Sequence, residues 1–279
     1  MQLLRDLEIG VMFWACRDPV ETIRELKALG ARCGQIGITG DFPLAGAAAK
    51  WKAALEAEKF PVVTAFCAYN GESYADVPTV QQTVGFIPPK TRAEREQRTY
   101  AVSDFAREAG ITSIATHIGF VPEDESHPDY VAVRDLVRRI CDHAAKNNQT
   151  FALETGQEAA GTLLRFFIDV NRPNLGINFD PANMILYGTG DPIAALSTLG
   201  QHVISVHCKD GDWPPKAVHG ALGEEKPLGQ GAVGMERFIT QLKAIRFKGP
   251  LNIEREVSDQ AQRLRDIGMG VKLLEKLRG

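Results

Sequence analysis

The sequence predicts a (β/α)₈ TIM barrel that occupies residues 1–279 as a single domain, and three observations predict it. Strand-like and helix-like segments alternate eight times, which gives about 35 residues for each strand–helix unit, a normal length for a unit with a crossover helix. No linker, low-complexity tract or charge block divides the chain. The first strand is followed by Cys16-Arg17-Asp18-Pro19, without the glycine-rich turn expected of the rival architecture, a doubly wound dinucleotide-binding sheet.

Each predicted strand is a short apolar run that ends in polar or turn-forming residues. The strands are expected at residues 7–15, 32–38, 62–69, 112–118, 150–155, 175–180, 203–209 and 250–257. The helices are expected at residues 19–29, 43–59, 92–109, 129–146, 161–170, 191–199, 235–245 and 259–277. Two long irregular connections, 70–90 and 211–231, are expected to form active-site walls, because barrels carry function on the loops after their strands.

Composition limits the classes of function. The chain has 279 residues and a formal net charge of −3, so it lacks the basic footprint of a nucleic-acid-binding protein. No apolar run is long enough to span a membrane, and residues 1–10 do not resemble a signal peptide. The five cysteines are scattered and include no C-x-x-C motif, which favours a reducing, cytoplasmic location over a disulfide scaffold.

Four polar residues stand at the ends of the last four predicted strands. They are Glu154, Asp180, His207 and Glu254. Burying an unpartnered carboxylate costs several kcal/mol, and three carboxylates together repel one another. One divalent cation would pair with all of them, and an oxygen-rich set with one imidazole suits Mn²⁺ best, with Mg²⁺, Co²⁺ or Zn²⁺ as alternatives. The other interpretation is a buried polar network, or ion pairs to the helices behind the strands.

These residues stand in phrases similar to those of one superfamily. The phrases are Leu153-Glu154-Thr155-Gly156, Phe179-Asp180-Pro181-Ala182-Asn183, His207-Cys208-Lys209-Asp210 and Leu228-Gly229-Gln230-Gly231. They resemble the xylose-isomerase-like superfamily of metal-dependent barrels, which includes ketose 3-epimerases, hydroxypyruvate isomerase, inosose dehydratase and the family 2 AP endonucleases. The resemblance implies one metal ion bound by Glu154, Asp180, His207 and Glu254. It also implies a keto-sugar isomerase or epimerase that transfers a proton through a metal-bound cis-enediolate.

The chemistry of the residues agrees with that implication. A lone carboxylate is a weak base for the proton beside a carbonyl, and a cation on the carbonyl oxygen stabilises the charge that develops. Carboxylates on the fifth and eighth strands would approach from opposite sides of the barrel mouth, so one face can lose a proton while the other gains one. Glu154 and Glu254 are therefore the predicted acid/base pair, and Asp180 and His207 are predicted to act only as ligands.

The sequence departs from the epimerase pattern at two positions. Asn183 stands where those enzymes usually have a histidine, and Trp213 stands where they often have an arginine. Both family residues contact substrate oxygens, and the phrase from His207 to Asp210 is more like the inosose dehydratase branch. The alternative prediction is a lyase or dehydratase that acts on a keto-cyclitol or a 3-keto-glycoside with the same metal site.

Six further residues are predicted to contact a substrate. They are His117, Glu158, Asn183, Lys209, Trp213 and Trp14. The alternatives are an imidazole bonded to a neighbouring loop for His117, a solvated loop position for Lys209 and aromatic packing for Trp14. Glu158 would otherwise be an acidic residue in the first turn of a helix, where it favours the helix dipole. Trp213 lies in a loop, where core packing explains a tryptophan less readily.

Two other functions fit less well. The three-zinc site of an AP endonuclease needs more histidines, including one where Asn183 stands, and the net charge offers no DNA-binding face. A non-catalytic sugar- or metal-binding barrel fits less well because all four candidate ligands are intact, although the fold alone does not exclude it. The expected partner is therefore a small carbohydrate substrate. Barrels of this class often dimerise, so a homo-oligomer is also expected.

Overall fold

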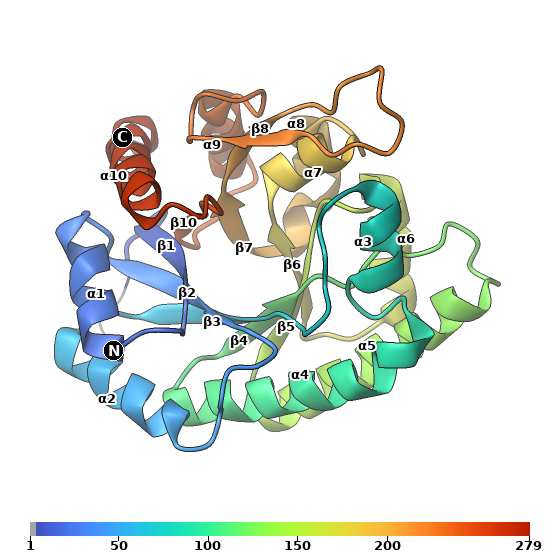
Figure 1. Ribbon diagram of the computed structural model, residues 1–279, viewed down its shortest axis with the longest axis horizontal. Coiled ribbons are helices and arrows are strands. Elements are labelled where there is room, and N and C mark those ends of the chain that lie inside the picture. Colours follow the sequence, from blue (N-terminus) through green and yellow to red (C-terminus); the bar gives the residue numbers. More distant parts are fainter. Residues whose placement is uncertain (1–3) are drawn as a thin grey trace.

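Eight parallel strands close a barrel within residues 4–279, the part of the chain that the computed structural model describes. The barrel strands are β1 (Ile9–Trp14), β2 (Cys33–Ile38), β3 (Val62–Cys67), β4 (Ser113–Thr116), β5 (Thr150–Glu154), β6 (Leu175–Phe179), β7 (Val203–Cys208) and β10 (Leu251–Ile253). Their order around the barrel is β1-β10-β7-β6-β5-β4-β3-β2. Figure 1 shows them at the centre of the molecule with helices around them. The predicted (β/α)₈ fold is confirmed.

Helices that return the chain from one strand to the next form the outer layer. They are α1 (Pro19–Ala28), α2 (Ala47–Glu58), α4 (Pro89–Ala109), α5 (Pro128–Lys146), α6 (Ala160–Val170), α8 (Pro192–Leu199), α9 (Met235–Ala244) and α10 (Gln260–Arg278). Helix α1 begins at the predicted signal, because the Asp18 carboxylate accepts hydrogen bonds from the N–H groups of Val20 and Glu21. Buried apolar side chains of these helices and of the strands form the main core.

The two long connections contain regular structure where the sequence predicts irregular loops. The first holds α3 (Val77–Thr83), whose start is capped by Asp76. The second holds an antiparallel hairpin of β8 (Asp210–Asp212) and β9 (Glu224–Lys226). These elements are only three to seven residues long, too short to show the periodicity on which the prediction depends.

Other boundaries also differ from the prediction. A short helix, α7 (Pro181–Tyr187), follows β6, and a 3₁₀ turn (Gly200–His202) precedes β7. Helix α2 begins at Ala47 rather than at residue 43, because Gly46 occupies its N-cap with a φ of 70°. The last barrel strand ends at Ile253 rather than at residue 257. The N–H of Glu254 still donates to Cys208 of β7, but that of Glu256 donates to the Glu225 carboxylate.

The two long connections meet above the barrel mouth. The N–H of Val77 donates to the carbonyl oxygen of Gly220 at 2.9 Å, and Figure 1 shows α3 beside the hairpin connection. The Asp210 carboxylate accepts hydrogen bonds from the N–H groups of Gly229 and Gly231 at 2.9 and 3.0 Å. The turn at residues 229–231 is therefore held to the first residue of β8.

Residues 1–3 belong to the segment in which no signal peptide is predicted, and they lie outside the described residues. None of the helices in residues 4–279 has both the length and the apolar character that crossing a membrane requires. Inside the barrel, Met12, Phe66, Ala115 and Ala152 form a small apolar cluster, with Trp14 packed against it.

Candidate metal centre

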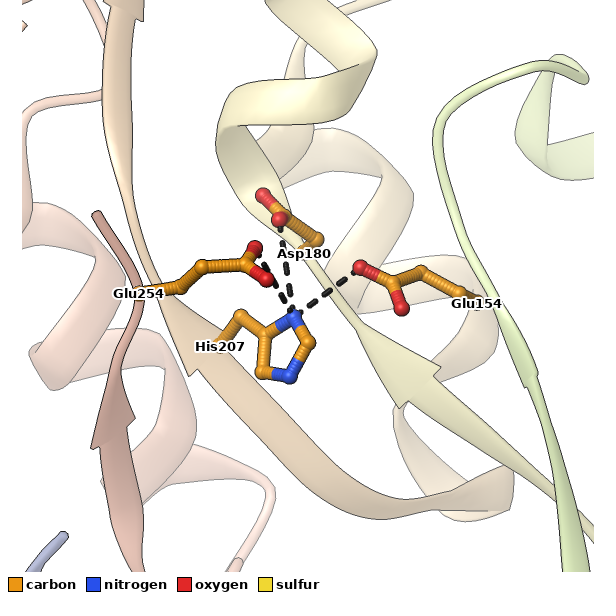
Figure 2. A group of neighbouring side chains, drawn as sticks. All are labelled: Glu154, Asp180, His207 and Glu254. Atoms are coloured by element: carbon orange, nitrogen blue, oxygen red, sulfur yellow. Dashed lines mark hydrogen bonds and ion pairs between the residues drawn. The ribbon is translucent and has the colours of Figure 1, made fainter. Parts of the chain in front are cut away.

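Four side chains converge at the carboxyl ends of four strands that are neighbours in the barrel. Glu154 ends β5, Asp180 follows β6, His207 lies in β7 and Glu254 follows β10. Each offers one ligand atom, and these atoms lie within 4.8 Å of one another. Figure 2 shows the three carboxylates around Nδ1 of His207. This nitrogen is 2.9 Å from Glu154 Oε1, 3.2 Å from Glu254 Oε2 and 3.7 Å from Asp180 Oδ2.

The stagger of the barrel brings these residues to one height. Glu154 pairs with Asn178, which is two residues before Asp180. His207 pairs with Asn252, which is two residues before Glu254. Strands in a closed barrel are tilted and offset along their length, so residues at one height need not be direct pairing partners. Between β6 and β7 a register shift places Asn178 opposite Ser205, so Asp180 and His207 are level. Alternation along each strand then points every second side chain into the barrel, where the four meet.

The cluster is short of positive charge. Three carboxylates surround one imidazole, and all four side chains are at most 11% exposed. The Lys209 ammonium adds one cation, 3.2 Å from Glu254 Oε2 and 4.0 Å from Asp180 Oδ2. Burial raises the pKa of Asp180 to about 6. Buried carboxylates without enough counter-charge are costly, so this set of donors fits a divalent cation.

The two carboxylate oxygens of Asp180 have different surroundings. Oδ1 accepts hydrogen bonds from the N–H groups of Ala182 and Asn183, at 2.8 and 3.0 Å, and so caps α7. Oδ2 is buried, and within residues 4–279 no group donates a hydrogen bond to it. A buried acceptor without a partner needs an explanation, and a cation between Asp180 and its neighbours would supply one.

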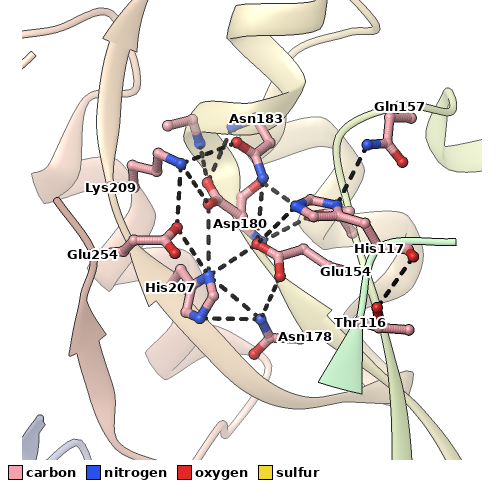
Figure 3. Close-up of polar contacts among 12 residues, drawn as sticks. Thr116, His117, Glu154, Gln157, Asn178, Asp180, Asn183, His207, Lys209 and Glu254 are labelled. Carbon is pink, nitrogen blue, oxygen red and sulfur yellow. Dashed lines mark hydrogen bonds and ion pairs between the residues drawn. The ribbon is translucent and has the colours of Figure 1, made fainter. Parts of the chain in front are cut away.

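Neutral donors surround Glu154 (Figure 3). Asn178 Nδ2 lies 3.3 Å from Glu154 Oε2, and Asn183 Nδ2 lies 3.3 Å from Oε1. His117 Nε2 is 3.9 Å from Oε1, and its other ring nitrogen is 3.4 Å from Gln157 Nε2. His117 and Asn183, two of the predicted substrate contacts, therefore lie beside the cluster.

A charged side chain lies beside Glu254 instead. Lys209 is 3% exposed, and its Nζ donates to Glu254 Oε2 at 3.2 Å, to Asn183 Oδ1 at 3.4 Å and to Glu256. The interpretation of Lys209 as a solvated loop residue is therefore wrong. Glu256 lies beyond β10 in sequence, and its backbone N–H donates to Glu225 of β9. The hairpin and the last strand thus meet next to Glu254.

The structure places the remaining predicted contacts farther from the four ligands. Glu158 precedes α6 rather than lying in its first turn, and its carboxylate accepts a hydrogen bond from Val121 N–H at 2.9 Å. Burial raises the pKa of Glu158 to about 7. Trp14 packs against the interior apolar cluster, and Trp213 is 46% exposed beyond β8. In residues 4–279 no hydrogen bond joins these three side chains to the four ligands, so their contact with a substrate stays a prediction.

Several residues at the centre escape sequence reasoning. Gln35 of β2 and Asn178 of β6 are fully buried and contact His207. Alternation predicts an inward position for Asn178, because it stands two residues before Asp180. Tyr74 comes from the first long connection, and its ring lies 5.8 Å from that of His117. The Tyr187 hydroxyl lies 3.5 Å from Gln157 Nε2. Both tyrosines come from segments in which no helix or strand is predicted, although Tyr187 ends α7.

Several known proteins are similar to this chain. A family model described as xylose isomerase-like TIM barrel matches residues 23–277. A xylose isomerase domain protein from Planctomyces limnophilus is 42% identical, with 98% of each chain covered and a TM-score of 0.92. None of the curated proteins matches this chain in sequence.

Two more distant structures share the fold. A 3-keto-D-glucoside 4-epimerase from E. coli is 17% identical, with 96% of this chain and 99% of that chain covered and a TM-score of 0.69. A xylose isomerase-like protein from Mycobacterium smegmatis, in complex with magnesium, is 17% identical, with 93% and 87% covered and a TM-score of 0.67.

Proposed function

Because the chain belongs to the xylose isomerase-like TIM barrel family, we propose that it is a divalent-metal-dependent isomerase or epimerase of keto-sugars. The observation that carries the proposal is the pair of glutamates, Glu154 and Glu254, on two sides of one buried imidazole nitrogen. One carboxylate on each side of a bound carbon allows a proton to leave from one face and return at the other face or at the neighbouring carbon.

The residues that would hold the cation are Glu154, Asp180, His207 and Glu254. A bound cation would withdraw electron density from a substrate carbonyl and so make the neighbouring C–H bond more acidic. Oxygen donors with one imidazole suit Mn²⁺ first, with Mg²⁺, Co²⁺ or Zn²⁺ as alternatives. The relative from Mycobacterium smegmatis was solved with magnesium.

The chain's own groups divide the remaining work. Glu154 and Glu254 exchange the proton, and the burial of both side chains keeps competing water away from them. His117 and Asn183 lie beside Glu154, and Lys209 lies beside Glu254, where each offers hydrogen bonds to sugar oxygens. Trp14 and Tyr74 offer apolar surface to a sugar face. Glu158 and Trp213 are proposed as outer contacts of the same substrate.

The alternative function is a lyase or dehydratase that acts on a keto-cyclitol or a 3-keto-glycoside. The position of Lys209 favours it, because a buried ammonium next to Glu254 is placed to hydrogen bond a departing hydroxyl. Proton removal beside the carbonyl is common to both reactions. They differ in whether the substrate regains the proton or loses water.

Removal of the metal tests the proposal. Dialysis against a chelator is expected to abolish turnover, and Mn²⁺, Co²⁺ or Mg²⁺ is expected to restore it. The control is the same dialysis with an equal excess of Mn²⁺ added to the chelator. Full activity in protein shown by elemental analysis to be metal-free would contradict the proposal.

A further inference from the structure

Gln35 is a fully buried amide that reaches His207 across the barrel interior. It lies in β2, which is not a neighbour of β7, and its Oε1 is 3.0 Å from His207 Nε2. His207 Nε2 is the ring nitrogen that faces away from the carboxylates, because the three carboxylates surround Nδ1. Gln35 therefore contacts the imidazole on the side opposite the carboxylates.

The surrounding amides fix the orientation of Gln35. Its Nε2 donates to Asn178 Oδ1 at 3.2 Å, and the Ser205 hydroxyl donates to the same oxygen. Asn178 Nδ2 lies 3.3 Å from both Glu154 Oε2 and His207 Nε2, and the anionic carboxylate is the stronger acceptor of the two. An amide whose nitrogen is committed as a donor presents its oxygen as an acceptor at the other contact. Gln35 Oε1 thus accepts a hydrogen bond, and the donor is the Nε2–H of His207.

The consequence reaches the opposite side of the ring. A neutral imidazole that carries its proton on Nε2 has a free lone pair on Nδ1. That lone pair points at three carboxylate oxygens between 2.9 and 3.7 Å away. An electron pair facing three anionic groups is unfavourable unless a cation lies between them.

We propose that Gln35 is a positioning residue that holds His207 as the Nε2–H tautomer and so presents Nδ1 to the cation. This inference rests on the proposed function, since it assigns a role toward the same metal ion. Ligating histidines generally donate their second N–H to an acceptor behind them, and loss of that acceptor typically weakens metal binding by about 10- to 100-fold. The acceptor here comes from a strand that contributes none of the four ligands.

The test measures Mn²⁺ affinity by isothermal titration calorimetry. Gln35→Met removes the acceptor and is expected to weaken binding by about 10- to 100-fold. Gln35→Glu keeps an acceptor behind the ring, although it loses the hydrogen bond to Asn178 Oδ1, and it is expected to retain most of the affinity. The matched control is Gln149→Met, because Gln149 is a buried amide whose partners are Ser103 and Ile111. That variant should lose fold stability and keep the wild-type affinity.

The measured affinities distinguish the role of Gln35 from the existence of the metal site. Equal Mn²⁺ affinity for Gln35→Met and the wild type would overturn the role of Gln35 and leave the metal site intact. A wild-type protein that binds no Mn²⁺ would overturn the proposed function, and the role of Gln35 with it. If Gln35→Met does not fold, ¹⁵N NMR of histidine-labelled, Mg²⁺-loaded wild type decides, with the His207 signals identified by their loss in His207→Asn. We expect His207 to carry its proton on Nε2, and a proton on Nδ1 would overturn the inference.

Discussion

Glu154 and Glu254 are the same residue type at similar distances from His207 Nδ1, but they are held in different ways. Glu154 ends a barrel strand, is 1% exposed and accepts hydrogen bonds from the amides of Asn178 and Asn183. Glu254 lies beyond the end of β10, is 11% exposed and accepts a hydrogen bond from the Lys209 ammonium. Neutral amide groups thus stabilise Glu154, and a buried ammonium stabilises Glu254.

The difference indicates which interactions stabilise Glu154 and which stabilise Glu254. Hydrogen bonds from amides depend on geometry and add no net charge, so the Glu154 side depends on how the strands are packed. An ammonium in a buried site also compensates negative charge, and its removal leaves carboxylates unpaired. The Glu254 side should therefore respond more strongly to the loss of one partner than the Glu154 side does.

The largest effect is expected from changes to the two glutamates themselves. Glu154→Gln and Glu254→Gln should each lower turnover by about 10²- to 10⁴-fold, because each loses a group that transfers a proton. The two variants should then differ in how fast they exchange substrate protons in D₂O. For one substrate, only the variant that keeps the proton-removing glutamate should still exchange the proton beside the carbonyl, as followed by proton NMR. Wild-type turnover in either variant would contradict the assignment.

The second effect contrasts the partners of the two glutamates. Lys209→Met should lower the free energy of unfolding of the metal-free protein by about 3–5 kcal/mol, because it leaves buried carboxylates without their ammonium. Asn183→Ala removes a neutral donor from Glu154 and a neutral acceptor from Lys209 without changing the charge, and it should cost about 1–3 kcal/mol. Urea unfolding in a chelator measures both values.

Added Mg²⁺ gives the control for this contrast. A divalent cation supplies the missing charge, so it should stabilise Lys209→Met more than it stabilises the wild type. Equal losses for the two variants would show that charge does not distinguish the two sides.

The smallest effect concerns Glu158, a buried carboxylate outside the cluster. Burial raises its pKa from 4.5 to about 7, so the folded protein holds a proton that the unfolded chain releases. Stability should therefore fall as the pH rises from about 4.5 to about 7 and then level off, by up to about 3 kcal/mol. Glu158→Gln keeps an acceptor for Val121 N–H and should remove this decline. Urea unfolding at several pH values measures it, and the same pH slope in both proteins would show that Glu158 is not its source.

The fold and the ends of its strands could be predicted from the sequence because both rest on local patterns. Apolar runs separated by amphipathic helices define the eight units, and a polar residue such as Asp180 at the end of an apolar run marks a position near the barrel mouth. The start of α7 was also readable, since Asp180-Pro181 is a helix start signal that the prediction leaves unused.

The rest depends on contacts between segments far apart in the chain. Gln35 and His207 are 172 residues apart, and no local pattern pairs them. Lys209 could be placed on the inward face by alternation, but its contact with Glu256 depends on where β10 ends and on how the hairpin closes. Tyr74 comes from the irregular first connection, and Tyr187 reaches Gln157 through a contact between separate segments that no local pattern marks.

The central claim is that two glutamates transfer a proton beside a carbonyl. Proton NMR in D₂O with Mg²⁺-loaded protein tests it most directly, with a panel of free ketoses, their phosphates, 3-keto-glycosides and inososes. We expect deuterium to enter at a carbon beside the carbonyl of at least one compound as a new sugar appears. Loss of water or of an aglycone with a new enone would instead establish the lyase. No exchange in any compound of the panel would contradict the claim.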